Sequence, residues 1–226
     1  MDVGPASEAI VRAGRRLGAN GLISAGEGNL SIRLADGSLL VTPSGRRKDE
    51  LEPADLVIVG PDDAVEPGGT QSRGDPAPVP TSDLAIHRAV YRARPDIEAV
   101  VHAHLPASMA LTLAGEIPDP KALPETALFL PRLPFLAFGP PGSTQLAARV
   151  AAAFREPPEP LPGAVLLERH GAVAVGRTVD AAVDRLELVE VLCRTWRDAL
   201  LVRAARRHVG RDGCPLPGDG PHTALE

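Results

Sequence analysis

The order of strand-like and helix-like segments is the feature that most constrains the fold of this chain. Residues 30–34 and 38–42 alternate between apolar and polar side chains, and the Asp36-Gly37 pair between them is a strong signal for a tight hairpin turn. Further strands are expected at residues 55–59, 97–104, 133–138, 164–167 and 172–175. Helices are expected at residues 6–19, 83–94, 143–154 and 179–207. A hairpin followed by mixed strands and helices predicts an α/β domain with a mostly antiparallel sheet.

The length of 226 residues suits a single domain, which we expect to span the whole chain, 1–226. Ser7 is expected to cap the first helix and Thr178 the last. Three segments rich in Pro, Gly or Asp separate or follow the regular elements and are expected to be irregular: residues 61–80, residues 115–143 and a flexible tail at 211–226.

Composition limits both the core and the chemistry. Hydrophobic residues make up 44% of the chain but aromatic residues only 3%, so the core must be built from aliphatic side chains. Tyr91 and Trp196 are the single tyrosine and the single tryptophan, and Trp196 is expected to pack in the apolar stripe of the last helix. A mechanism that needs a phenol therefore has one candidate.

Charge and cysteine usage exclude several classes of protein. The formal net charge of −5 argues against general binding of polyanions, so no nucleic-acid partner is expected. No segment approaches the roughly 18 apolar residues of a membrane-spanning helix, so no membrane partner is expected either. Cys193 and Cys214 form no Cys-x-x-Cys pair, which favours a reducing compartment. We therefore expect a soluble, cytoplasmic protein.

Three histidines form the sharpest candidate for a chemical site. Side chains two residues apart on a strand point to the same face, so His102 and His104 should emerge together, and His170 follows another short apolar strand. Three neutral imidazoles with one open position are typical of a catalytic zinc site. The alternative is a chance pair of rings held only by hydrogen bonds. The other histidines are interpreted as structural or surface residues: His87, His208 and His222.

Small and hydroxyl-bearing residues gather in three turns: Gly28-Asn29, Ser44-Gly45 and Thr81-Ser82. Glycine lets the backbone approach a ligand closely, and the free N–H groups of a helix N-terminus suit a phosphate. Ordinary turn formation and helix capping would explain each segment taken alone. Asp83 follows the last of these turns and could direct a carboxylate at the metal site. Three cationic residues could add charge near an anion, with at least two of them expected to face water: Arg46, Arg47 and Lys48.

Taken together, these segments resemble the class II aldolase/adducin family over roughly residues 6–205. The most specific match is the Arg-Pro-Asp-x-x-Ala-Val-Val-His-x-His block that ends at His104, followed some 65 residues later by His-Gly-x-x-x-x-Gly. The full matching stretches are residues 21–33 (GLISAGEGNLSIR), 41–45 (VTPSG), 81–104 (TSDLAIHRAVYRARPDIEAVVHAH), 140–146 (PPGSTQL) and 167–182.

The resemblance implies an α/β fold of three α-β-α layers, in which helices flank a central antiparallel sheet, and commonly a homotetramer. It also implies a lyase that cleaves a small sugar phosphate by a retro-aldol reaction through a zinc-stabilised enediolate. By position His102, His104 and His170 correspond to the metal ligands, for zinc or another divalent ion, and Asp83 to a catalytic glutamate. The residues that correspond to a phosphate site are Gly28, Asn29, Ser44, Gly45, Thr81 and Ser82.

Three departures from the family pattern bear on the reaction. Asp83 replaces the aldolase glutamate, as in the 4-epimerase of the family, which favours epimerase-like chemistry or a fourth metal ligand. Glu27 stands where many members have Ser or Thr, and it would disfavour a phosphate dianion if it pointed inward. The aldolase tyrosine has no counterpart within residues 105–168. Glu125 is the candidate acid or base in its place, acting across a subunit interface, unless it is a plain surface glutamate.

Three functional hypotheses follow. The first is a zinc-dependent sugar-phosphate aldolase of the fuculose-1-phosphate type. The second is an epimerase or dehydratase that uses the same metal site. The third is a non-enzymatic interaction module like adducin, which keeps the fold without the metal histidines; the presence of all three histidines counts against it.

Overall fold

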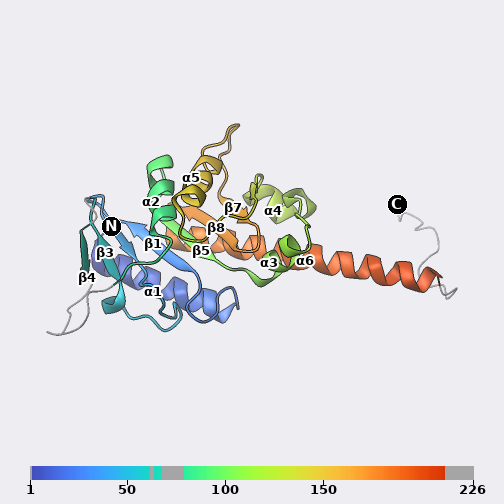
Figure 1. The fold of residues 1–226 in the computed structure, drawn as a ribbon, viewed down its shortest axis with the longest axis horizontal. Coiled ribbons are helices and arrows are strands. Elements are labelled where there is room, and N and C mark those ends of the chain that lie inside the picture. Colours follow the sequence, from blue (N-terminus) through green and yellow to red (C-terminus); the bar gives the residue numbers. More distant parts are fainter. Residues whose placement is uncertain (1, 62–63, 68–78, 212–226) are drawn as a thin grey trace, which may run out of the picture.

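The computed structural model describes residues 2–61, 64–67 and 79–211 (Figure 1). Its sheet has eight strands: β1 Asn29–Arg33, β2 Leu39–Val41, β3 Val57–Val59, β4 Val65–Pro67, β5 Ala99–Ala103, β6 Phe135–Leu136, β7 Ala164–Leu167 and β8 Gly171–Gly176. Their order is β4-β3-β2-β1-β5-β8-β7-β6, and every neighbouring pair is antiparallel except the parallel pair β6 and β7. The predicted mostly antiparallel sheet is confirmed.

Helices cover both faces of this sheet, as Figure 1 shows. They are α1 Val3–Ala19, α2 Leu84–Ala93, α3 Pro106–Leu113, α4 Pro124–Phe129, α5 Thr144–Ala153 and α6 Val179–Arg211, with short 3-10 turns at Pro53–Asp55 and Pro120–Ala122. One core joins α1, α3 and α6 to one face of the sheet, and a second core joins α2 and α5 to the other face. The expected three α-β-α layers are therefore present.

The two cores follow from the alternation of side chains along each strand. On β2, Leu40 belongs to the core beneath α1 and α6, whereas its neighbours Leu39 and Val41 belong to the core beneath α2 and α5. Both cores are almost wholly aliphatic, as the composition predicted. Trp196 packs against the first core from α6, which confirms its expected structural role.

Four local expectations were wrong. Helix α1 begins at Val3 instead of residue 6, and the Ser7 hydroxyl donates to the carbonyl of Val3 (2.8 Å) instead of capping the helix. Strand β4 lies inside the predicted loop 61–80, and helix α4 inside the predicted irregular segment 115–143. Proline fits the first turn of a helix, where its missing N–H costs no hydrogen bond, so the prolines that suggested irregularity also begin α4.

Other expectations at the ends of the chain have mixed outcomes. The Thr178 hydroxyl accepts a hydrogen bond from the backbone N–H of Ala181 (3.1 Å), which confirms it as the cap of α6. The predicted flexible tail lies, apart from its first residue, outside the described residues, as do Cys214 and His222. Among the described residues, no helix is both long and apolar enough to cross a membrane.

Candidate functional site

Adjacent strands bring the three predicted metal ligands together. His102 on β5 lies opposite Asn29 of β1 on one side and Val173 of β8 on the other, and His170 immediately precedes β8. The ring centroid of His102 lies 5.1 Å from that of His104 and 4.7 Å from that of His170, and the last two centroids are 5.1 Å apart. One nitrogen from each ring lies within 4.8 Å of the others, so the three could hold one metal ion.

Two glycines allow the backbone around these histidines to pack so closely. Gly171 follows His170 with a φ of +90°, and a Cβ there would lie 2.1 Å from the carbonyl oxygen of Ala103. Gly28 has a φ of +70°, and a Cβ there would lie 2.9 Å from the carbonyl oxygen of His102. A residue with a side chain would be strained and would clash at either position, so both glycines are needed for this geometry.

The rings of His102 and His170 are in the neutral protonation state that binds a metal. His102 donates from Nδ1 to the carbonyl of Ala172 (3.0 Å), which leaves its Nε2 as a lone-pair acceptor. That Nε2 and the Nδ1 of His170 are buried without a protein hydrogen-bond partner. Burial lowers the pKa of His102 to about 3, helped by the neighbouring His170, and burial likewise lowers the pKa of His170. Neutral, buried and unpartnered imidazole nitrogens fit a divalent metal.

Glu27 lies beside the third histidine. Its Oε1 is 3.4 Å from Nδ1 of His104, while its Oε2 accepts hydrogen bonds from the backbone N–H (3.2 Å) and the hydroxyl (2.8 Å) of Ser24. Each carboxylate oxygen is therefore engaged by a neighbouring group. A carboxylate next to the non-ligating nitrogen of a histidine commonly orients that ring toward a metal. The sequence raised Glu27 only as a charge unfavourable to phosphate and did not indicate this contact.

Asp83 is held in place at the start of α2. Its Oδ2 accepts from the side-chain amide of Asn29 (3.0 Å) and its Oδ1 from the backbone N–H of Gly142 (3.0 Å). Burial opposes ionisation, but the nearby His102 and the hydrogen bond from Asn29 outweigh it and hold the pKa of the carboxyl below its usual value. Asp83 is thus an ionised carboxylate next to the histidine cluster.

A cavity of about 520 Å³ opens onto this group. Asp83, His104 and His170 line it together with Glu27, and His102 lies beside the other two rings with only 1% of its surface exposed. All of the residues predicted to bind phosphate also line the cavity: Gly28, Asn29, Ser44, Gly45, Thr81 and Ser82. The structure therefore places the predicted metal-binding residues and the predicted phosphate-binding residues around the same cavity.

Lys48, one of the three cations that the sequence placed close to the Ser44-Gly45 turn, also lines this cavity. Only 2% of it is exposed, and its ammonium donates to the carbonyls of Gly26 (2.8 Å) and Arg46. Among the described residues no carboxylate lies within ion-pair distance of it, and burial lowers the pKa of Lys48 to about 8. Arg46 and Arg47 are exposed, which confirms that at least two of the three cations face water.

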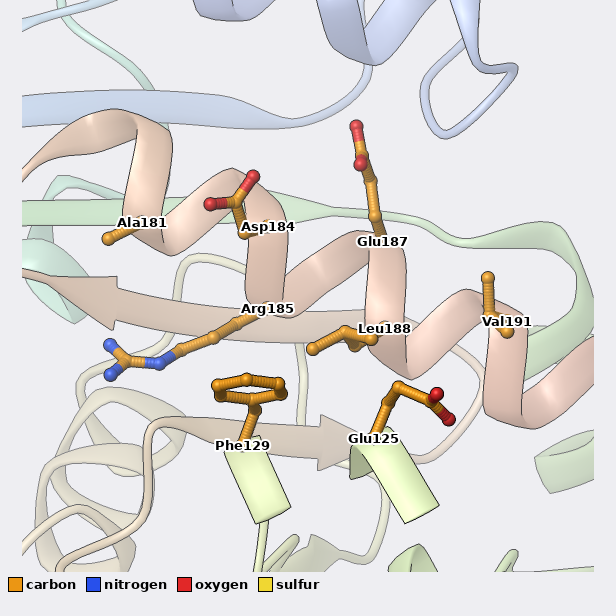
Figure 2. A pocket seen from close by; sticks show the side chains of 8 residues that line it. All are labelled: Glu125, Phe129, Ala181, Asp184, Arg185, Glu187, Leu188 and Val191. Carbon is orange, nitrogen blue, oxygen red and sulfur yellow. The ribbon is translucent and has the colours of Figure 1, made fainter. Parts of the chain in front are cut away.

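Glu125 lies elsewhere in the subunit. It projects from α4 into a separate hollow of about 500 Å³ against α6, where Phe129 and Leu188 lie near it (Figure 2). The hollow is lined by Glu125, Phe129, Ala181, Asp184, Arg185, Glu187, Leu188 and Val191. Within one chain Glu125 therefore does not join the histidine cavity, and its action in the site of a neighbouring subunit stays a prediction.

Fold and site together define a class of protein. An α/β domain carries three histidines where its central strands end, next to a cavity lined by hydroxyls and glycines. Residues 8–197 match the family described as Class II Aldolase and Adducin N-terminal domain, and the chain belongs to that family.

Several named relatives are similar to this chain over most of its length. The chain is 34% identical to methylthioribulose-1-phosphate dehydratase of Acidiphilium cryptum, covering 81% of this chain and 85% of the relative. It is 34% identical to 3-oxo-tetronate 4-phosphate decarboxylase of Cupriavidus necator (84% and 82%). It is 33% identical to 5-methylthioribulose-1-phosphate/5-deoxyribulose-1-phosphate aldolase of Rhodospirillum rubrum (83% and 79%).

The solved structures agree with this membership. The fold is similar to that of L-fuculose-1-phosphate aldolase from Thermus thermophilus, with a TM-score of 0.67, 27% identity and coverage of 93% of this chain and 98% of that chain. The resemblance stated from the sequence motifs is confirmed.

Proposed function

We propose that this protein is a metal-dependent lyase acting on a small phosphorylated ketose or related ketone. The observation that carries the proposal is the shared cavity, in which the histidine cluster and the hydroxyl-lined turns face the same space. The named relatives act on small phosphorylated substrates, which supports the choice of substrate class.

His102, His104 and His170 would hold the metal, and zinc is the ion that three neutral imidazoles favour. When bound, such an ion supplies a Lewis acid that polarises a substrate carbonyl. The remaining chemistry belongs to the residues of the chain. The hydroxyls of Ser44, Thr81 and Ser82 and nearby backbone N–H groups would bind the phosphate and thereby position the carbon that reacts.

Asp83 is the residue that would move the proton. It is ionised, buried and held at both carboxylate oxygens, so it can act without first reorienting. In a retro-aldol cleavage it would accept the proton of the hydroxyl on the far carbon of the bond that breaks and return that proton to the carbon next to the carbonyl. Its hydrogen bonds to Asn29 and Gly142 restrict its rotation. Retro-aldol cleavage in the manner of fuculose-1-phosphate aldolase is the first reaction we propose.

Dehydration is a second candidate, favoured by the position of Tyr91. This tyrosine is 5% exposed, its hydroxyl lies 3.0 Å from the backbone carbonyl of Ser31 and 3.3 Å from that of Glu98, and it does not line the cavity, so it is not placed to donate a proton there. A dehydration removes one proton at carbon and returns one to the departing hydroxyl. Asp83 could perform both transfers without a phenol.

Product analysis tests these assignments. Zinc-loaded protein would be incubated with L-fuculose 1-phosphate, 5-deoxyribulose 1-phosphate, methylthioribulose 1-phosphate and 3-oxo-tetronate 4-phosphate, and the products followed by ¹H and ³¹P NMR. Dihydroxyacetone phosphate formed with an aldehyde from a ketose 1-phosphate indicates aldol cleavage, and the same phosphate formed with CO2 from 3-oxo-tetronate 4-phosphate indicates decarboxylation. Loss of water without carbon–carbon cleavage indicates dehydration. Turnover should fall by about 10²-fold or more in Asp83→Asn. No turnover of any of these phosphates by zinc-loaded protein would refute the proposal.

We further propose a homo-oligomer, with the tetramer implied by the family resemblance, in a cytoplasmic setting. Exposed apolar side chains on α4 and α6 support an assembly, because Leu128 is 70%, Phe129 60% and Val191 50% exposed. Sedimentation equilibrium should give four chain masses; a single chain mass at micromolar concentration would refute the tetramer.

A further inference from the structure

A chain of buried hydrogen bonds runs from the site into the interior between α2 and the sheet. Asn29 donates from Nδ2 to Asp83 (3.0 Å), and its Oδ1 lies 2.6 Å from Nε2 of His87. The other ring nitrogen of His87, Nδ1, lies 2.6 Å from the hydroxyl of Ser31, which in turn lies 3.0 Å from the hydroxyl of Tyr91. All five residues are at most 6% exposed.

The spacing of these residues explains how the chain of bonds forms. Asn29 and Ser31 are two apart on β1 and therefore point to the same face of the sheet. His87 and Tyr91 are four apart on α2 and therefore lie one above the other on the same side of the helix. Packing this side of the helix on that face of the sheet places the polar pairs opposite one another. His87 was expected to be a structural or surface residue, and neither pair taken alone indicates this network.

The donors and acceptors from Asp83 to Ser31 follow from the Asp83 end of this hydrogen-bond network. The ionised Asp83 carboxylate can only accept, so Asn29 must face it with its NH₂ group. The Oδ1 of Asn29 then needs a donor, which can only be the Nε2–H of His87. A neutral ring protonated at Nε2 has an acceptor at Nδ1, and the Ser31 hydroxyl donates to it.

The ring of His87 is held in the neutral form that this direction requires. The residue is completely buried, and burial lowers the pKa of His87 to about 4 although the charge of Asp83 opposes the shift. With the proton on Nδ1 instead, Nε2 would face Oδ1 of Asn29 as a second acceptor. The Asn29 amide would have to rotate and turn its oxygen toward the Asp83 carboxylate.

We propose that His87 is a positioning residue of the active site: as the neutral Nε2–H tautomer, it fixes the Asn29 amide and thereby the orientation of the Asp83 carboxylate. The inference rests on the proposed function in so far as Asp83 is the base. Its structural content, the single tautomer of His87, does not depend on any activity.

The first test is read on the wild-type protein, and a variant serves only to assign the signal. Long-range ¹H–¹⁵N spectra of uniformly labelled wild-type protein, with and without zinc, distinguish a protonated ring nitrogen from an unprotonated one. We expect one ring that stays protonated at Nε2 alone from neutral pH down to about pH 5, assigned to His87 by its absence from His87→Gln. A His87 ring protonated at Nδ1, on both nitrogens, or in a mixture of tautomers at neutral pH would overturn the proposal.

The second test separates positioning from general stability. His87→Phe removes both hydrogen bonds, and kcat should fall by about 10- to 100-fold with KM little changed, as is typical when the partner that orients a reactive group is lost. His87→Gln can still donate to Asn29 and should retain more of the kcat. The control is Val90→Ala, which empties part of the same helix interface without touching the hydrogen-bonded chain.

The outcomes are distinguishable. Unchanged kcat in a folded His87→Phe, or an equal loss in Val90→Ala at matched thermal stability, would overturn the positioning role. If His87→Phe does not fold, the wild-type spectrum and the His87→Gln kinetics decide. If the wild-type protein turns over none of the phosphates, the proposed function fails, while the spectrum still tests the tautomer.

Discussion

At the scale of single residues, Glu27 shows how one carboxylate can serve the metal site without binding the metal. Its two oxygens face Ser24 and His104, so the side chain is braced on one side and adjacent to a ligand ring on the other. A carboxylate in that position favours the His104 tautomer with its proton on Nδ1, which leaves Nε2 for the metal. The negative charge of Glu27, which was expected to disfavour a phosphate, thus lies next to His104 and helps to orient it.

Replacement of Glu27 should therefore weaken metal binding. We expect Glu27→Gln to raise the zinc dissociation constant by about 10-fold, because the amide orients His104 less strongly than the carboxylate does. Competition with a chromophoric chelator measures this constant without any substrate. Glu8→Gln, an exposed position on α1, is the matched control. A zinc affinity equal to that of wild type would show that Glu27 plays no part in holding the ligand.

Some site residues could be predicted from the sequence and others could not, and the difference has a physical cause. His102 and His104 could be predicted to converge because a two-residue period on a strand is a local property. The hydrogen bonds of His87 and the burial of Lys48 could not be predicted, because each depends on groups that tertiary packing supplies. Lys48, for example, is buried by its contact with the carbonyl of Gly26, which lies in another turn. Charged residues are usually exposed, and that general tendency is wrong at this position.

At the scale of elements, the turn between β7 and β8 sets the position of His170. This turn ends at Gly171, whose φ of +90° and close approach to Ala103 bring β8 alongside β5. A side chain at Gly171 would add a steric clash to the strain of the backbone. The strand pairing that places two metal ligands side by side therefore depends on one residue without a Cβ.

Two glycine substitutions distinguish the stability cost of backbone strain from the additional cost of a steric clash. Gly37→Ala alters a position with a φ of +86° and open space around it, so it should destabilise the protein by about 1 kcal/mol. Gly171→Ala has a similar φ but would also place its Cβ 2.1 Å from a carbonyl oxygen, so the loss should be clearly larger, about 3 kcal/mol or more. Urea unfolding at equilibrium measures both. Equal losses would mean that β8 can move aside.

The elements themselves were predicted unevenly. The hairpin formed by β1 and β2 and the amphipathic helices α2, α5 and α6 were expected, because each carries a periodic pattern or a strong turn signal. Helices α3 and α4 were not expected. Both begin at a proline, and both are short, with 8 and 6 residues. A short helix has too few turns to show a period, and in the segment 115–143, which contains α4, the prolines suggested irregular structure.

At the scale of the whole molecule, the buried Lys48 should leave a signature in the pH dependence of stability. Its pKa falls from 10.5 to about 8 on folding, so between these values the unfolded chain holds a proton that the folded chain has lost. Stability should then rise with pH across this window, and the penalty should be complete below pH 8. The full effect is up to about 3 kcal/mol for a shift of this size.

The measurement compares wild type with Lys48→Met by urea unfolding from pH 8 to pH 10.5. The stability of wild type relative to the variant should increase with pH, because the methionine does not titrate. Burial raises the pKa of Tyr91, which gives the opposite slope near pH 10, but this contribution is present in both proteins and cancels in the difference. A flat or falling difference would mean that Lys48 stays protonated in the folded protein.

The burial of Lys48 also allows transient opening of the site to be measured by chemical modification of the protein. Lys48 and Lys121 are its two lysines, and Lys121 is exposed whereas Lys48 is closed in behind the cavity. An amine-directed acylating reagent should therefore modify Lys121 at once and Lys48 only when the turns around the cavity open. Peptide mass spectrometry would follow the two modifications separately, with Lys121 as the reference for the reaction rate of an exposed amine. The rate at Lys48 relative to Lys121 would then report how often the site opens, without a fluorophore or an engineered probe.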